Sequence, residues 1–217
     1  TVLVEENGAR FEVPLAGGQK TGWFYDHRMN RQRLQAYAPA KKVLDVFSYV
    51  GGWGIQAACA GASQVTCVDA SSSAVDAVHH NAKLNGLENV DTIEGDAFDA
   101  LKALADEKEK FDIVVLDPPA LIPRRRDQKA GEQAYARLNQ LGLRLLERDG
   151  LLVSASCSMH LSQEKLIDII RGSGRKIDRF VQLLEQGHQA PDHPIVPGIP
   201  ETDYIKSCFV RSLTGFL

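Results

Sequence analysis

Short apolar runs that alternate with amphipathic stretches constrain the fold of this chain more than any other feature. Such an alternation of strands and helices predicts a mostly parallel sheet with right-handed crossovers. The expected strands are residues 43–47, 65–69, 90–93, 111–116 and 151–154, and the expected helices are residues 54–60, 72–85, 97–106, 131–146 and 162–172. We therefore predict an α/β, Rossmann-like fold built on a seven-stranded, mostly parallel sheet flanked by helices.

The two ends of the chain complete this fold. Residues 2–6 and 10–13 flank Asn7-Gly8, a pair that predicts a β-hairpin ahead of the sheet. A final strand, residues 204–211, follows a long proline-rich connection. We expect this last strand to insert antiparallel into the sheet.

The chain begins at Thr1, inside an expected strand, so we expect a fragment or a processed form. Residues 1–20 are then the hairpin remnant of an upstream domain, and residues 21–217 form the main domain. An exposed hairpin edge favours pairing with a second copy, which makes a homodimer an expectation.

Composition excludes several classes of protein. At 217 residues and 44% hydrophobic content, the chain can bury one substantial core. Its net charge of −3 gives no global basic field, so any RNA partner must be bound by local basic patches. No apolar run approaches the roughly 18 residues of a membrane span, and no signal peptide opens the chain. Its four cysteines form no CxxC pair, and the histidines show no metal-ligand spacing, which favours a reduced cytoplasmic protein without a metal.

Two of the apolar runs end abruptly in polar residues. The run at 111–116 leads into Asp117-Pro118-Pro119, and the run at 151–155 leads into Ser156-Cys157-Ser158. Open α/β sheets bind their ligands beyond the carboxyl ends of the strands. These two strand ends are therefore predicted to hold a carboxylate and a thiol over one cleft, the pair that methylation of a pyrimidine ring carbon requires.

A glycine-rich turn follows the first sheet strand. Residues 52–57 formally match the GxGxxG/A dinucleotide fingerprint, but residues 48–50 separate the strand from the first glycine. The fuller pattern, Asp45-x-Phe47-x-x-x-Gly51-Gly52-x-Gly54, resembles the first motif of class I S-adenosylmethionine (SAM)-dependent methyltransferases. Its glycines let the backbone approach the amino-acid end of the cofactor.

Two further aspartates follow the next two strands. Asp69 ends the second strand, where a carboxylate can accept both ribose hydroxyls, and Asp96 follows the third, within reach of the adenine amino group. The alternative interpretation is that each aspartate is a helix N-cap or a solvated loop charge.

Several ordered motifs together resemble the ribosomal large-subunit methyltransferase I-type family. They are the segment from Thr21 to Arg28, the Asp117-Pro118-Pro119 and Ser156-Cys157-Ser158 triplets, and a late segment from Asp192 to Lys206. The resemblance covers nearly the whole chain. It implies methylation of ribosomal RNA to 5-methylcytosine, with a PUA domain and a small middle domain upstream. Tyr25 and Ala120-Leu121 depart from the family pattern and leave the target base open.

The resemblance also implies a set of cofactor residues. We expect SAM to be held by Phe24, Tyr25, Asp26, Arg28, Asp45, Phe47, Ser48, Gly51, Asp69, Ala70, Ser71, Asp96, Ala97, Asp117 and Pro118. Phe24, Tyr25 and Trp23 can cover the cofactor or the target base, although aromatic residues near a domain junction are more often core.

Methylation at C5 of cytosine calls for covalent catalysis, because that carbon is a poor nucleophile. A thiolate that adds to C6 makes C5 enamine-like, and Cys157 is the one cysteine placed at a strand end. Its thiolate forms either through a lowered pKa or by deprotonation on attack, with Arg124–Arg126 and His160 as candidate sources of positive potential. The alternative is a small core residue.

Two other steps need a carboxylate or a base. Asp117 is expected to hydrogen-bond the N3/N4 edge of the ring, although the prolines that follow it also suit a structural turn. Glu201, His193 and Asp192 are the candidates for removing the C5 proton, and the sequence does not choose among them.

Arg124, Arg125, Arg126 and Lys129 follow the Asp-Pro-Pro triplet and are candidates for phosphate contacts, or else for a solvated loop. The leading function is thus a SAM-dependent RNA cytosine-C5 methyltransferase acting through a Cys157 adduct. Alternatives are a methyltransferase of other specificity (uracil-C5, amino group or protein) and a non-catalytic RNA-binding module. A nicotinamide oxidoreductase is a more distant alternative.

Overall fold

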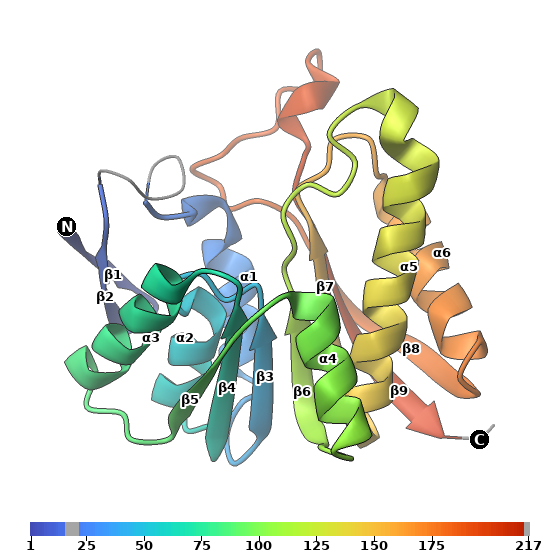
Figure 1. The fold of residues 1–217 in the computed structure, drawn as a ribbon. Helices are drawn as coiled ribbons and strands as arrows, with labels where there is room; N and C mark the ends of the chain where they lie inside the picture. The colour runs from blue at the N-terminus through green and yellow to red at the C-terminus, as the bar shows by residue number, and fades with distance from the viewer. Residues whose placement is uncertain (16–21, 215–217) are drawn as a thin grey trace.

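The fold is a seven-stranded sheet between two layers of helices, preceded by a separate two-stranded hairpin (Figure 1). The computed structural model describes residues 1–15 and 22–214. The sheet order is β5-β4-β3-β6-β7-β9-β8, and β9 runs antiparallel to both of its neighbours. The strands of this sheet are β3 (Lys42–Val46), β4 (Gln64–Asp69), β5 (Val90–Glu94), β6 (Phe111–Leu116), β7 (Leu146–Ser156), β8 (Arg179–Gly187) and β9 (Lys206–Thr214). The predicted sheet, with its last strand inserted antiparallel, is confirmed.

Each face of the sheet has its own helical layer and its own apolar cluster. One cluster packs α1 (Arg28–Gln35), α2 (Gly52–Cys59) and α3 (Ser72–Leu84) against one face, together with the hairpin. The other packs α4 (Ala97–Asp106), α5 (Gln128–Leu145) and α6 (Gln163–Arg175) against the opposite face. Both layers leave the carboxyl ends of the parallel strands open toward the top of the view in Figure 1.

Several predicted boundaries differ from those of the structure, and those of α5, β7 and β9 are wrong by two residues or more. Helix α5 begins at Gln128 instead of residue 131, because the polar residues Gln128 and Lys129 carry no apolar periodicity. Strand β7 begins at Leu146, well before residue 151, because the buried Leu146 pairs with Phe111 of β6 and the exposed polar residues 147–149 follow it in the strand. Strand β9 covers Lys206–Thr214, shifted from the predicted residues 204–211.

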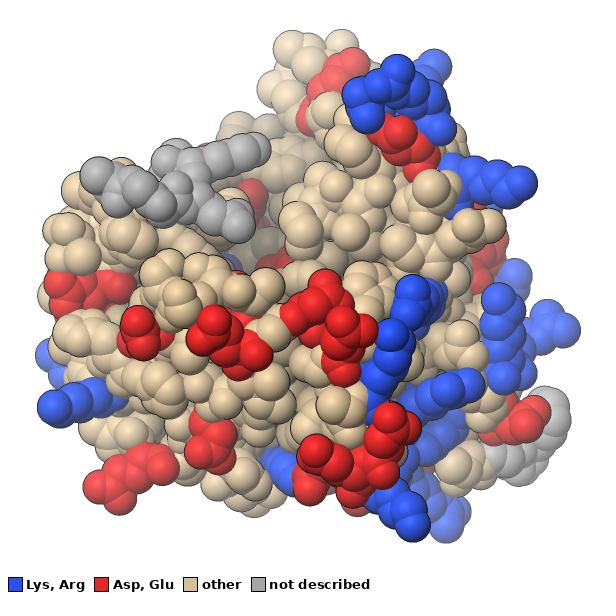
Figure 2. Space-filling model, viewed as in Figure 1, with Lys and Arg blue, Asp and Glu red and all other residues tan. Residues whose placement is uncertain are grey.

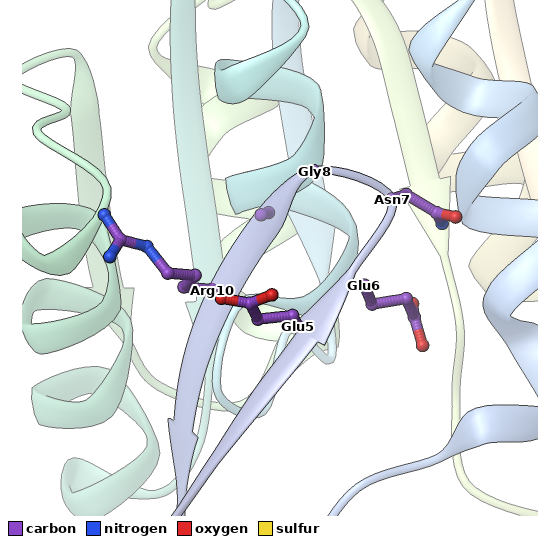
Figure 3. A pocket seen from close by; sticks show the side chains of 6 residues that line it. Glu5, Glu6, Asn7, Gly8 and Arg10 are labelled. Atoms are coloured by element: carbon purple, nitrogen blue, oxygen red, sulfur yellow. The ribbon is translucent and has the colours of Figure 1, made fainter.

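The hairpin, β1 (Val2–Glu6) and β2 (Ala9–Val13), packs against the helices of the first layer. Figure 3 shows Asn7 and Glu6 on the side of α1 and Arg10 on the side of α3. Glu6 is 4% exposed, and its carboxylate accepts from Arg31 Nε at 2.6 Å and from Trp23 Nε1 at 2.8 Å. A hollow of about 360 Å³ lies beside the turn. The origin of residues 1–20 in an upstream domain stays a prediction.

Two absences hold for the described residues. Within residues 1–15 and 22–214, no helix is both long enough and apolar enough to cross a membrane. In the same part of the chain, no three histidine, cysteine, aspartate or glutamate side chains gather as a metal site would require.

Candidate active site

The loop that joins β3 to α2 turns tightly at the carboxyl edge of the sheet. Phe47, Tyr49 and Gly51 have positive φ angles of 65°, 50° and 88°. Such angles are ordinary for glycine but strained for the two aromatic residues, and strain of this kind gathers at binding sites. Beneath the loop, the fully buried Asp45 accepts a hydrogen bond from the Gly54 N–H at 2.8 Å.

Gly54 is needed for packing inside the protein. A Cβ atom at this position would lie 2.6 Å from Cys67 Sγ and 3.1 Å from Asp45 Oδ2. This glycine of the motif therefore lets α2 lie close on the sheet.

The two aspartates predicted to contact the nucleoside, Asp69 and Asp96, form different kinds of hydrogen bond within the protein. Asp69 accepts from the Tyr49 N–H at 2.8 Å and from the Ser71 N–H at 3.0 Å, so it ties the end of β4 to the glycine loop. Asp96 is the N-cap of α4 and accepts from two amides of its first turn at 2.9 and 3.2 Å. The N-cap interpretation thus holds for Asp96, while its contact with adenine stays a prediction.

The other residues predicted to contact the cofactor follow the same edge. Phe24 meets Tyr49 edge-to-face, with ring centroids 6.0 Å apart, and Tyr25 beside it is 46% exposed. The rest are Ser48 in the loop, Ala70 and Ser71 between β4 and α3, Ala97 at the start of α4, and Pro118 after β6.

Two aromatic side chains, Trp53 and His27, lie against the carboxylate of Asp117 after β6. Trp53 Nε1 donates to Asp117 Oδ2 at 2.8 Å, and His27 Nε2 lies 3.5 Å from Asp117 Oδ1. Trp53 belongs to the glycine-rich helix α2, and His27 belongs to the short 3₁₀ helix η1 (Tyr25–His27). The carboxylate is therefore oriented by Trp53 and lies beside His27, two residues that the sequence did not assign to it.

Cys157 directly follows β7, the neighbour of β6 in the sheet. Burial, followed by the negative charges of Asp117 and Asp26, raises the pKa of this thiol to about 11. The resting thiol is therefore protonated at neutral pH. Of the two routes to a thiolate, the structure favours deprotonation on attack over a lowered pKa.

The serines beside Cys157 form a buried hydroxyl cluster. Tyr135 Oη lies 2.8 Å from Ser156 Oγ and 2.9 Å from Ser158 Oγ. These bonds join α5 to the end of β7 and hold the backbone on both sides of the cysteine.

Lys206 is a site residue that the sequence analysis did not single out. It is 5% exposed, and its ammonium group donates to the carbonyl oxygens of Ser158 and Tyr204 at 2.6 and 2.9 Å. Burial lowers the pKa of Lys206 to about 8. The place of Lys206 at the end of the late motif, Asp192 to Lys206, was the available signal.

Asp26 reaches the same region from η1. Tyr204 Oη donates to Asp26 Oδ2 at 2.9 Å, whereas the buried Oδ1 atom has no hydrogen-bond partner among the described residues. The charge of Asp26 also acts on Cys157. Asp26, a member of the predicted cofactor set, therefore also lies near Cys157.

The three candidate bases lie on the long connection between β8 and β9. Glu201 is exposed in the short helix η3 (Pro200–Thr202). Asp192 pairs with Arg28 at 2.8 Å and lies 3.3 Å from His193 Nδ1. None of the three is among the largest influences on the pKa of Cys157, so the structure does not choose among them.

Figure 2 shows a hollow above the strand ends, with blue side chains clustered at the upper right, over the start of α5. That cluster corresponds to Arg124–Arg126 and Lys129, which are exposed. One of its cations, Arg124, is paired with Asp127 at 2.9 Å.

Comparison with known proteins identifies the family. The sequence profile of S-adenosylmethionine-dependent methyltransferases matches residues 1–200. The chain belongs to this methyltransferase family. It is 39% identical over 213 residues to "Ribosomal RNA large subunit methyltransferase I" of Aeromonas salmonicida, covering 97% of this chain and 54% of that protein. The same name belongs to a Klebsiella pneumoniae relative, 36% identical over 96% of this chain and 52% of that protein. The chain therefore spans about half the length of these relatives.

Solved structures agree with this family. The methyltransferase SMU.776, solved in complex with SAH, superimposes with a TM-score of 0.86 at 25% identity, over 97% of this chain and 55% of that one. Trm5b from Pyrococcus abyssi has a TM-score of 0.71 at 18% identity, over 97% and 55%, and shares the fold. The predicted resemblance and the SAM-dependent class are confirmed.

The carboxyl edge of this methyltransferase fits the chemistry of SAM. Asp45 Oδ1 and Asp26 Oδ1 are buried and lack hydrogen-bond partners among the described residues. Such acceptors suit the ammonium and hydroxyl donors of the cofactor, because an unpaired buried carboxylate oxygen is otherwise costly. We expect SAM to be held by Asp45, Asp69 and the strained loop between β3 and α2.

Proposed function

We propose that this methyltransferase transfers a methyl group to C5 of a cytosine in ribosomal RNA, with Cys157 as the nucleophile. The observation that carries the proposal is the pairing of two adjacent strand ends. Asp117 ends β6 and Cys157 ends β7, and the carboxylate charge acts directly on the thiol. The names of the relatives support ribosomal RNA as the substrate class.

The proposed reaction begins when the Cys157 sulfur adds to C6 of the ring and the thiol proton passes to N3, the ring nitrogen that gains electron density. Asp117, oriented by Trp53, hydrogen-bonds the N3/N4 edge and stabilises the charge that develops there. Bound SAM supplies an electrophilic methyl group to the activated C5. A base then removes the C5 proton, and the C6–sulfur bond breaks to restore the aromatic ring and the cysteine.

The base is the least constrained part of the proposal. Glu201, His193 and Asp192 remain candidates, and Asp26 joins them. Asp26 has one buried carboxylate oxygen without a described partner and a charge that reaches Cys157. A base must come within hydrogen-bond reach of the proton, so this buried oxygen is a reasonable acceptor.

RNA binding is proposed to use the exposed cluster Arg124–Arg126 and Lys129. This cluster overlooks the hollow above the strand ends (Figure 2). Contacts of this kind hold phosphates without reading sequence, and they weaken with salt. The relatives are about twice as long as this chain, so further RNA contacts outside it are expected.

Trapping with 5-fluorocytidine RNA tests the proposed nucleophile. A ring that carries fluorine at C5 has no proton to lose there, so the covalent adduct should accumulate. We expect the wild-type protein, in its longest natural form and with SAM, to give an adduct that survives denaturing electrophoresis. Cys157→Ser should give none while still binding SAM by calorimetry.

Matched controls make this experiment decisive. Cys59→Ser and Cys208→Ser should still trap, because Cys59 ends α2 and Cys208 is fully buried in β9, where its sulfur accepts from Gln163. RNA containing 5-fluorouridine separates cytosine from uracil specificity. An adduct that persists without Cys157, or normal methylation by Cys157→Ser, would refute the covalent mechanism.

A further inference from the structure

Lys206 is buried in a way that needs an explanation. Lysine side chains are almost never fully buried without a partner of opposite charge, because desolvation of the ammonium group is expensive. Lys206 is 5% exposed, and its nitrogen donates only to two backbone carbonyls, those of Ser158 and Tyr204. Among the described residues, no carboxylate forms an ion pair with it. Unpaired buried charges of this kind are candidates for a functional role.

Lys206 is joined to the residues before and after Cys157 in the sequence. Lys206 begins β9 and pairs in register with Ser156 of β7, the residue before Cys157. Its ammonium group holds the carbonyl of Ser158, the residue after Cys157, at 2.6 Å. The cation is therefore fixed against the three-residue segment that carries the thiol.

We propose that Lys206 is a positioning residue whose ammonium group stabilises the Cys157 thiolate as it forms. The inference rests on the proposed function, in which that thiolate attacks the ring. The two carbonyl bonds keep the ammonium in place and leave its third N–H without a described partner, so its charge is available to the sulfur.

The charges around the thiol explain why a cation is needed there. Asp117 from the end of β6 and Asp26 from η1 both disfavour a thiolate, and Lys206 opposes them. In the described part of the chain, Lys206 is the cation among the largest influences on the Cys157 pKa. Neither Arg124–Arg126 nor His160 is among them.

Cys157 and Lys206 each shift the pKa of the other. Ionised Cys157 raises the pKa of Lys206, and so does Asp203, against the larger effect of burial. Tyr135 and Tyr204 also face the thiol, but the pKa of each is raised, so their hydroxyls stay neutral. Lys206, with a pKa of about 8, is therefore the member of the cluster that changes charge nearest to neutral pH.

The pH dependence of alkylation provides a test that needs no RNA. The rate at which iodoacetamide modifies Cys157, followed by mass spectrometry of its peptide, reports the thiolate fraction. We expect Lys206→Met to lower this rate about tenfold at pH 8, which corresponds to about one unit of thiol pKa. The rate at Cys59 should not change.

The shape of the profile gives a second readout. Above the Lys206 pKa of about 8, the wild-type lysine starts to lose its proton. The thiolate–ammonium state then stops increasing, and the wild-type rate levels off. The Lys206→Met rate should keep rising with pH, so the two profiles should converge. Lys206→Arg keeps the charge, and we expect it to recover part of the rate.

The control is Lys102→Met, which removes an exposed lysine of α4 that is paired with Asp99. Equal Cys157 rates in folded Lys206→Met and wild-type protein would overturn the inference. If Lys206→Met does not fold, a wild-type profile with no change of slope near pH 8 would overturn it instead. Trapping separates the two proposals: a shifted alkylation profile without an RNA adduct contradicts the nucleophile, whereas an adduct with an unshifted profile contradicts the role of Lys206.

Discussion

At the scale of single residues, Asp45 is a buried carboxyl group whose ionisation lowers the stability of the folded protein. Burial raises the pKa of this carboxyl from 3.8 to about 7, and the Gly54 N–H only partly offsets that effect. The native state then binds the proton more tightly than the unfolded chain does. The stabilising contribution of the protonated Asp45 carboxyl is complete below about pH 4 and is lost as pH rises to about 7.

Asp45→Asn should therefore stabilise the SAM-free protein at pH 8 relative to wild type, by at most about 4 kcal/mol. The advantage should disappear at pH 4, because both side chains are then neutral. Urea unfolding at the two pH values measures this. The same variant should bind SAM more weakly in calorimetry, and a gain of stability that is equal at both pH values would contradict the assignment.

At the scale of elements, the hairpin is joined to the helices through one buried carboxylate. Glu6 of β1 accepts from Arg31 of α1 and Gln56 of α2, as well as from Trp23. Removal of one member of a buried ion pair leaves the other uncompensated, which typically costs about 3–5 kcal/mol. Glu6→Ala should lower the free energy of unfolding by about this amount in urea denaturation.

Glu5 offers a matched control because it is the exposed neighbour of Glu6 on the same strand. Glu5→Ala should change the free energy of unfolding by less than about 0.5 kcal/mol. If both variants behave alike, the hairpin contributes little through this carboxylate and is held mainly by its apolar residues.

At the scale of the whole molecule, the site is assembled from both layers and from the long connection before β9. A ligand that binds such a site stabilises the whole fold. At about 100 times its Kd, SAM should add about 2.7 kcal/mol of stability. For a domain of this size that corresponds to about 5–10 °C in Tm. NAD should give no shift in the same differential scanning experiment, and an NAD shift with no SAM shift would contradict the assignment of Asp45 and Asp69 to SAM.

The sequence alone determined the sheet, the hairpin, the methyltransferase family and the strand ends that carry Asp117 and Cys157. These features follow from local periodicity and from motifs contiguous in the chain, because residues near in sequence share one element. The boundaries of α5 and β7 were predicted wrongly because polar residues near the start of each element interrupt the apolar periodicity.

Tertiary structure decided the surroundings of those residues. Lys206 pairs with Ser156, the neighbour of Cys157, across the β7–β9 register, and Trp53 and Asp26 reach the same site from α2 and η1. The raised pKa of Cys157 depends on burial and on charges distant in sequence. Such quantities depend on distances through space, which no local pattern encodes, so the chemical state of the thiol could be known only from the folded chain.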